Sequence, residues 1–161
     1  MSIKLNNKLI TLSTENTSYQ MKIDELGYLF HTWYGKKIET TDDMSYRISS
    51  IDRGFCGNPY ETMDRTYSLD IFPQEYSTFG NGDYRADCIQ VVHPDGTNVL
   101  DLKYDSCEIT RGKYQLKGLP GFTWSEDEGE SIQVNLIDKE SGIRVELLYG
   151  VLEKYLSLIH I

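Results

Sequence analysis

The side chains of this sequence that could do acid–base chemistry are carboxylates gathered in one stretch of the chain: Asp52, Asp64, Asp70, Glu75 and Asp83. Glycoside hydrolysis, for example, requires two carboxylates flanking one glycosidic bond. Spacing alone does not place two of them across one sugar, so a turn residue or an arginine-bound acceptor is the ordinary alternative for each. We interpret Glu75 and Asp83 as structural, and we expect Asp64-Arg65 and Asp83-Tyr84-Arg85 to anchor a loop through charge-assisted pairs.

A second chemical feature is the segment Ile51-Asp52-Arg53-Gly54-Phe55, which combines a carboxylate, a guanidinium and an aromatic ring. Aromatic rings stack on the apolar faces of sugars, and carboxylates accept hydrogen bonds from sugar hydroxyls. Asp52 is therefore a candidate substrate contact, with a structural Asp–Arg pair as the alternative. Phe55 is more typical of a core residue than of a stacking platform.

Cysteines and histidines do not form a metal-binding pattern. They are widely spaced and contain no Cys-x-x-Cys pair: Cys56, Cys88, Cys107, His31, His93 and His160. We expect no metal ion, and reduced, mostly buried thiols. The sequence also lacks nucleophile-elbow, P-loop, dinucleotide-binding and zinc-protease motifs, so no cofactor is predicted. Gly80-Asn81-Gly82 is weak as a phosphate loop because it neither follows a clear strand nor opens a helix.

Charge and hydropathy exclude several classes of partner. The formal net charge is −9, and no basic stripe is present, so binding to nucleic acid or to anionic lipid is not expected. No apolar run approaches the roughly 20 residues that span a bilayer. The first eight residues lack the apolar stretch of a signal peptide, and we therefore expect a cytoplasmic protein.

Strand patterns and turn signals account for most of the remaining sequence. Alternation with period two is clearest at Tyr19, Met21 and Ile23, and again along residues 132–149. The expected strands are 19–24, 28–34, 88–93, 99–104, 132–136 and 143–149, and the expected turns are 24–27, 94–97, 126–130 and 139–142. Many short strands without a convincing helix predict one all-β domain, a sandwich or a barrel.

The stretch from Lys36 to about Tyr84 lacks periodicity and is rich in Gly, Asn, Asp, Pro and Ser. A structureless segment of this length inside a compact domain is unusual and often functional. Aromatic residues recur along it, and we expect them to anchor the loop by burial: Tyr46, Phe55, Tyr60, Tyr67, Phe72, Tyr76 and Phe79.

The last six residues, Leu-Ser-Leu-Ile-His-Ile, match the one-frame translation of a transposon-end adapter used in preparing sequencing libraries. We interpret residues 156–161 as an artificial tail, with native sequence ending at about Tyr155. The alternative is a natural apolar strand.

Beyond these patterns, segments spread along the chain to about Tyr155 resemble the N-terminal domain of the glycoside hydrolase family 36 α-galactosidases. Each segment is weak alone, but their order and spacing are specific. They are Ser18-Tyr19-Gln20-Met21, Gly27-Tyr28-Leu29 with His31, Trp33-Tyr34-Gly35-Lys36, Asp52-Arg53, 64–70, 73–76, 79–85, Gly112-Lys113, Gly118-Leu119-Pro120 and Tyr149 with Glu153-Lys154-Tyr155.

The resemblance implies a β-supersandwich that precedes a (β/α)₈ barrel, with this chain covering about the first half of the sandwich, residues 1–155. In that family the two catalytic Asp residues of a retaining mechanism lie in the barrel, and terminal α-linked galactose is released from melibiose- and raffinose-type sugars without a cofactor. No segment here matches the barrel, so no catalytic residue can be assigned. In tetrameric members, the Asp of a hydrophobic-Asp-Arg loop contacts the sugar in a neighbouring subunit, and the matching residue here is Asp52.

The resemblance thus predicts a non-catalytic part of an α-galactosidase, inactive alone, whose partners are α-galactosides and, in a tetramer, its own subunits. Two alternatives remain open from the residues themselves. One is a stand-alone carbohydrate-binding module, and the other is a purely structural β-sandwich.

Overall fold

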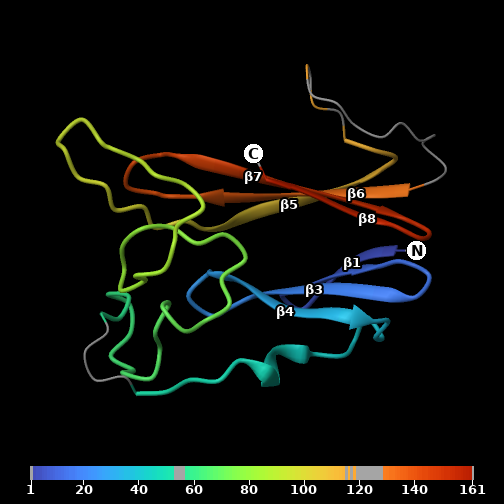
Figure 1. The fold of residues 1–161 in the computed structure, drawn as a ribbon, viewed down its shortest axis with the longest axis horizontal. Helices are drawn as coiled ribbons and strands as arrows, with labels where there is room; N and C mark the ends of the chain where they lie inside the picture. The colour runs from blue at the N-terminus through green and yellow to red at the C-terminus, as the bar shows by residue number, and fades with distance from the viewer. Residues whose placement is uncertain (1, 53–56, 115, 117, 119–128, 161) are drawn as a thin grey trace.

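The structure, a computed structural model, describes residues 2–52, 57–114, 116, 118 and 129–160. Its strands form two four-stranded antiparallel sheets, each with neighbours in chain order. The first sheet comprises β1 (Ser2–Asn6), β2 (Leu9–Ser13), β3 (Thr17–Ile23) and β4 (Leu29–Lys36). The second comprises β5 (Lys103–Arg111), β6 (Gly129–Ile137), β7 (Arg144–Leu152) and β8 (Leu156–His160). This arrangement confirms the all-β, antiparallel sandwich predicted from the sequence (Figure 1).

One hydrophobic core lies between the two sheets. Every second residue of the paired strands points into it, as the alternation of Ile132, Val134 and Leu136 predicted. The first sheet and the following loop contribute Ile3, Ile10, Leu12, Met21, Ile23, Leu29, Leu100 and Leu102, and the second contributes Ile132, Val134, Leu136, Val145, Leu147, Tyr149 and Val151. Full burial of each large aliphatic side chain stabilises the fold by about 1.5–3 kcal/mol before the entropy of ordering is counted.

The hairpins on which this core depends are made by short turns. Asn7 and Lys8 have φ values of 44° and 68°, the left-handed pair that a two-residue hairpin between β1 and β2 requires. Residues 139–142 turn β6 into β7, where Gly142 has a φ of 74° and donates its N–H to the Asp138 carbonyl. The second turn was predicted and the first was not, because Asn-Lys is a weaker turn signal than a pair containing Gly.

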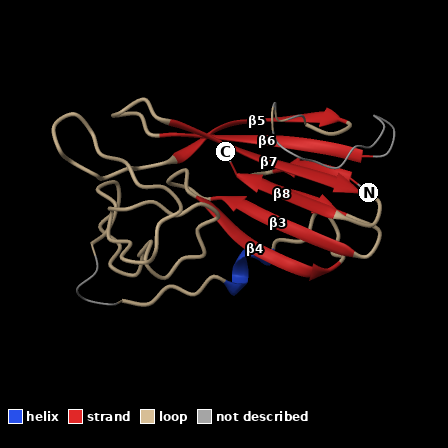
Figure 2. Cartoon of the chain, turned by 45° about the horizontal axis from the view of Figure 1, so that its top comes forward, coloured by secondary structure: helices blue, strands red, loops and turns tan. Residues whose placement is uncertain are grey.

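The connection between the two sheets is a long loop, residues 37–102, that gathers at one end of the sandwich (Figure 2). Its described residues contain one short 3₁₀ turn, η1 (Met44–Arg47), whose N-cap Asp43 accepts a hydrogen bond from the Ser45 N–H. The loop predicted for residues 36–84 is therefore confirmed, and it extends further along the chain than expected.

Burial of the loop aromatics is only partly as predicted. Phe72 is buried, and Tyr67 packs beside it in a second small cluster with Tyr28 and Phe30, while Tyr76 packs against the main core. In contrast, Tyr46, Tyr60 and Phe79 are exposed, so for these three the anchoring prediction is wrong. Phe55 lies outside the described residues.

Two predicted strands differ from the structure. Residues 88–93 form no strand. Ile89 and Val91 lie against the core, but with the described residues the segment makes one bridge, from Ile89 to Thr78. The apolar residues alternate there because one side of the segment packs against the core, and not because the segment pairs with a neighbouring strand. The strand expected at 99–104 begins only at Lys103. The turn at 94–97 is confirmed by two backbone hydrogen bonds: the His93 N–H donates to the Thr97 carbonyl, and the Gly96 N–H donates to the His93 carbonyl.

The segment interpreted as an artificial tail, residues 156–161, overlaps β8, whose backbone pairs antiparallel with β7 from Leu147 to Val151. This backbone geometry is that of the alternative, an apolar strand, and the artificial origin of the six residues stays a prediction. No helix among the described residues is long and apolar enough to cross a membrane.

Candidate functional site

Asp52, the predicted substrate contact, lies on the long loop with its side chain 48% exposed. Its Oδ1 is 3.3 Å from a guanidinium nitrogen of Arg65, whose side chain is 67% exposed. An Asp–Arg pair is therefore present, but the arginine is Arg65, 13 residues after Asp52 in the sequence. Arg53 and Phe55 lie outside the described residues. Because the pair is in solvent, its Coulomb energy is at most about 1 kcal/mol.

The predicted Asp64–Arg65 pair is wrong. Asp64 Oδ1 instead accepts hydrogen bonds from the backbone N–H and the hydroxyl of Thr66, which closes a local turn. Those two bonds hold the pKa of Asp64 below its usual value. Because Asp64 is bonded to Thr66, the Arg65 guanidinium pairs with Asp52 instead.

Lys103, at the start of β5, connects the loop near Glu61 to the second sheet. Its ammonium pairs with Glu61 and lies 3.5 Å from Asp101 Oδ2, above the rings of Tyr28 and Tyr60 at 5.0 and 5.5 Å from their centroids. Burial alone would lower the pKa of Lys103, but the hydrogen bond with Glu61 and the charge of Asp101 outweigh it and raise that pKa.

The predicted Asp83–Arg85 anchor is confirmed. Asp83 has only 1% of its side chain exposed, and Arg85 donates to both of its oxygens, from Nε at 3.0 Å and from a terminal nitrogen at 2.8 Å. Gln74 Nε2 adds a third bond at 2.6 Å, and Arg85 also reaches the Leu69 carbonyl. Asp83 is thus bound within the loop and its charge is compensated, which fits a structural role.

Glu75 is also structural, as predicted, and it joins three parts of the fold. The hydroxyl of Tyr19 on β3 donates to both carboxylate oxygens at 2.7 Å, and that of Tyr149 on β7 donates to Oε1 at 2.8 Å. His31 Nδ1 lies 3.7 Å from Oε2, beyond hydrogen-bond distance. Burial raises the pKa of Glu75 and the two tyrosine hydrogen bonds oppose that rise, while burial lowers the pKa of His31.

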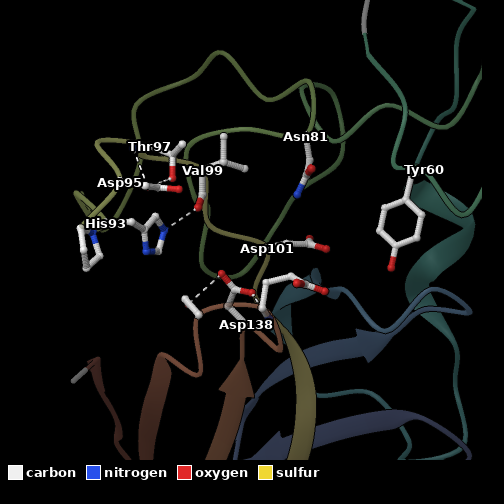
Figure 3. Close-up of a pocket in the computed structure, with 11 residues that line it drawn as sticks. Tyr60, Asn81, His93, Asp95, Thr97, Val99, Asp101 and Asp138 are labelled. Carbon is white, nitrogen blue, oxygen red and sulfur yellow. Dashed lines mark hydrogen bonds between the residues drawn. The ribbon is translucent and has the colours of Figure 1, made fainter.

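A hollow of about 640 Å³ opens between the loop and the β6–β7 turn (Figure 3). It is lined by Tyr60, Asn81, His93, Pro94, Asp95, Thr97, Val99, Asp101, Asp138, Glu140 and Ser141. Asn81 and Asp101 point into it from the loop, and Asp138 lies at the start of the turn opposite (Figure 3). Neither the hollow nor the Arg65 and Lys103 contacts were predicted, because they join residues far apart in sequence, for which the sequence carries no local signal.

Metal-ligand side chains do not cluster in the described part of the chain, where no three His, Cys, Asp or Glu residues come together. Of the cysteines, Cys107 is half-buried beside the core, whereas Cys88 is exposed, so the prediction of mostly buried thiols is wrong at Cys88. Cys56 lies outside the described residues.

Similar proteins of known identity point to one family. The sequence model of the glycosyl hydrolase family 36 N-terminal domain matches residues 27–157. The bifunctional alpha-galactosidase/sucrose kinase AgaSK of Mediterraneibacter gnavus is 47% identical over 150 residues, covering 92% of this chain and 16% of that protein. Alpha-galactosidase AgaA of Geobacillus stearothermophilus is 37% identical over 158 residues, covering 96% of this chain and 21% of AgaA.

Solved structures agree with the sequence matches. The galactosidase domain of AgaSK superimposes with a TM-score of 0.89 at 46% identity, covering 95% of this chain and 21% of that one. AgaB, a GH36 alpha-galactosidase from Geobacillus stearothermophilus, superimposes with a TM-score of 0.88 at 36% identity, covering 99% of this chain and 22% of that one. The chain therefore spans about a fifth of the length of these relatives.

Proposed function

Because this chain belongs to the N-terminal domain family of the family 36 glycosyl hydrolases, we propose that it is the non-catalytic β-sandwich part of an α-galactosidase. The observation that carries the proposal is 47% identity over 150 residues with a galactosidase, together with the shared fold. Such an enzyme releases terminal α-linked galactose with retention, using carboxylates from a barrel that this chain does not match. The sandwich alone is inactive.

The substrates proposed for the parent enzyme are α-galactosides of the melibiose and raffinose type, and no cofactor takes part. Related AgaA variants of Geobacillus stearothermophilus have been solved in complex with raffinose and with stachyose. We place the enzyme in the cytoplasm, where the exposed Cys88 thiol would stay reduced.

Asp52 is proposed to contact the substrate in the active site of a neighbouring subunit, within a homotetramer whose assembly the sandwich supports. Two observations support this role: the Asp52 carboxylate is about half exposed, and its Arg65 partner is more exposed still. Sugar hydroxyls can reach a carboxylate exposed in this way, while the guanidinium limits its rotation.

A chimera tests both parts of the proposal. We would replace the matching segment of AgaSK with this chain and measure melibiose hydrolysis, expecting a chimera whose kcat stays near that of AgaSK. Asp52→Ala in the chimera should raise KM roughly 10-fold or more, because a charged hydrogen bond to a sugar hydroxyl is lost. Asp105→Ala is the matched control, since Asp105 forms a similar exposed pair with Arg144, and it should leave KM unchanged.

Three results would count against the proposal. An inactive chimera that is folded and assembled would contradict the α-galactosidase assignment. An unchanged KM in the Asp52→Ala chimera would leave Asp52 a structural residue only. Hydrolysis of melibiose by the isolated chain would contradict its non-catalytic role.

A further inference from the structure

The hollow between the loop and the β6–β7 turn is built from separate segments that lie between Tyr60 and Ser141, and none of its lining residues belongs to the Asp52–Arg65 pair (Figure 3). From its shape, charge and polar groups, we propose that it binds a neutral saccharide of one or two rings. This site is additional to the substrate contact proposed for Asp52 and does not depend on that role. Its volume of about 640 Å³ lies within the range of pockets that enclose small ligands.

Several acceptors that line the hollow are held in place by the protein itself. Asp101 Oδ1 accepts a hydrogen bond from the Tyr28 hydroxyl at 2.8 Å, and Asp138 accepts one from the Glu140 N–H at 2.9 Å and one from Ser141 at 3.0 Å. His93 Nε2 lies 2.9 Å from the Val99 carbonyl. Each carboxylate oxygen can accept more than one hydrogen bond, so a fixed carboxylate can still accept a hydrogen bond from a sugar hydroxyl. Such groups need little ordering on binding.

Asn81 supplies a group of the opposite kind, an amide that both donates and accepts. It has a φ of 52° between Gly80 and Gly82, both also left-handed, and this bend directs its side chain toward Asp101 and Asp138 (Figure 3). A larger residue at Gly80 would be strained, because φ is 114° and an added Cβ would lie 2.6 Å from Val99 Cγ1, which would have to move. Within the described residues the Asn81 amide has no hydrogen-bond partner in the protein, although the neighbouring side chains are bound. Paired donor and acceptor atoms of this kind match adjacent sugar hydroxyls.

The charge of the hollow limits the ligand to neutral molecules or cations. Asp95, Asp101, Asp138 and Glu140 contribute negative charge, and no Lys or Arg side chain of the described residues lines the hollow. Lys103, the nearby cation, is already paired with Asp101 and Glu61. Phosphorylated sugars and uronic acids would meet like charges, which costs binding energy. Hydroxyl-rich neutral sugars, in contrast, donate hydrogen bonds to carboxylates.

Tyr60 provides an aromatic surface at the rim of the hollow. The side chain is among the most exposed aromatics of the described chain, at 86%, so core packing does not explain its position. Its ring is held near Lys103, whose ammonium lies 5.5 Å from the ring centroid. A ring that is oriented but accessible can stack on the apolar face of a hexose. An amide, fixed acceptors and an aromatic face together favour a saccharide over a cation, which would need only oxygen ligands.

Saturation-transfer difference NMR of the 161-residue chain with melibiose tests this proposal, because the method observes the sugar whatever the size of the protein assembly. We expect saturable transfer to the sugar protons with a Kd on the order of 1 mM. Asn81→Gly remains compatible with the left-handed backbone and removes the side-chain amide, and it should weaken binding about fivefold or more. Tyr60→Ala should do the same. Tyr84→Ala removes another exposed tyrosine, 74% exposed and outside the hollow, and should leave binding unchanged.

Other outcomes would overturn the proposal. One is the absence of saturation transfer at roughly 10 mM melibiose. A second is equal transfer in the wild type and in an Asn81→Gly chain whose thermal melt is unchanged. A third is transfer to galacturonate as strong as the transfer to melibiose. Displacement of the sugar by Ca²⁺, with a higher melting temperature in Ca²⁺ alone, would make the hollow a cation site instead. The chimera assay is independent: an Asp52-dependent KM with no binding at the hollow would reject only this inference, and the reverse pattern would reject only the role of Asp52.

Discussion

Glu75 shows how one buried side chain connects distant parts of this chain. Only 3% of its side chain is exposed, and its two oxygens accept hydrogen bonds from tyrosines on opposite sheets, while its backbone N–H donates to the Leu29 carbonyl at the start of β4. Removing the carboxylate would take from two tyrosine hydroxyls in the interior an acceptor that they use, at a cost of about 1–3 kcal/mol each. The residue therefore fixes the loop to the sandwich.

Glu75 also predicts a pH dependence of stability. Burial raises the pKa of Glu75 above its ordinary value of 4.5, so the folded chain binds this proton more tightly than the unfolded chain does. Its titration therefore stabilises the fold fully below pH 4.5, and that contribution is lost as the pH rises through the folded pKa. Glu75→Gln retains a hydrogen-bonding group but does not titrate. We expect the melting temperature of Glu75→Gln, relative to the wild type, to increase between about pH 4 and pH 8.

Thermal melts of both proteins across this pH range measure the difference directly. His31, whose pKa burial lowers, is present in both proteins, so its own titration largely cancels in the comparison. A difference in melting temperature that stays constant with pH would mean that Glu75 has the same pKa in the folded and unfolded chains.

Burial also separates the two kinds of Asp–Arg pair in this chain. Asp83 is almost fully buried, whereas Asp105 is 39% exposed and its partner Arg144 is 61% exposed. We expect Arg85→Met to destabilise the fold by about 2–3 kcal/mol, because the buried Asp83 carboxylate loses its cation. This cost is lower than that for a fully buried pair, because the Arg85 side chain is 40% exposed. Arg144→Met should cost less than about 1 kcal/mol. Urea unfolding of the two variants compares these costs, and equal destabilisation would mean that burial does not matter here.

At the scale of elements, the sequence predicted what local patterns encode. The β3–β4 and β6–β7 hairpins were correctly predicted because one face of each is apolar and a turn residue follows. The β1–β2 hairpin was missed because β2 is buried on both faces, which removes the alternation, and β5 because its exposed surface is largely polar. Residues 88–93 show the converse error, since alternation reports burial but not whether a neighbouring strand exists.

The candidate sites follow the same division. Asp52 could be singled out from its loop context and from the family resemblance, and the local Asp83–Arg85 pair could be predicted from its spacing. Arg65 as the partner of Asp52, Lys103 as the tie to Glu61, and the hollow at Asn81 depend on how the loop folds back on the sheets. Contacts between residues so far apart in sequence cannot be read from periodicity or turn signals.

The loop itself depends on one close backbone approach. At Gly82, with a φ of 83°, an added Cβ would lie 2.2 Å from the carbonyl oxygen of Gly57, so backbone would have to move. Gly142 has a similar φ of 74° but nothing within 4 Å of the same position. Gly142→Ala should therefore cost only about 1 kcal/mol of left-handed strain, while Gly82→Ala should cost at least about 2 kcal/mol more. Chemical denaturation measures both, and equal costs would show that the approach to Gly57 is dispensable.

At the scale of the molecule, the inner faces of the two sheets cover each other, although the chain spans only about a fifth of its relatives' length. Several connections cross between the sheets. They include the shared hydrophobic core, the Glu75 carboxylate bonded to Tyr19 and Tyr149, and the Ile3 N–H that donates to Glu130 at 2.7 Å. The Tyr104 N–H on β5 also donates to the Gly27 carbonyl at the β3–β4 turn. Among the described residues, no further strand pairs with the outer edges of β1, β4, β5 and β8, although the start of β4 bridges the loop between Phe30 and Gln74.

These connections predict that the two sheets unfold as one cooperative unit. Leu147 on β7 is fully buried in the shared core, and Leu147→Ala should destabilise the fold by about 3 kcal/mol. If the core is shared, native-state hydrogen exchange should show the same loss of protection at the Leu12 amide in β2 as at the Val134 amide in β6. Of these two residues, Val134 is the one that pairs with Leu147. Val92→Ala, at a side chain 80% exposed, is the control and should change protection by less than about 0.5 kcal/mol. Loss of protection confined to β5–β8 would instead show that each sheet is stable without the other, and the first sheet would then have to draw its stability from the loop that packs on its outer face.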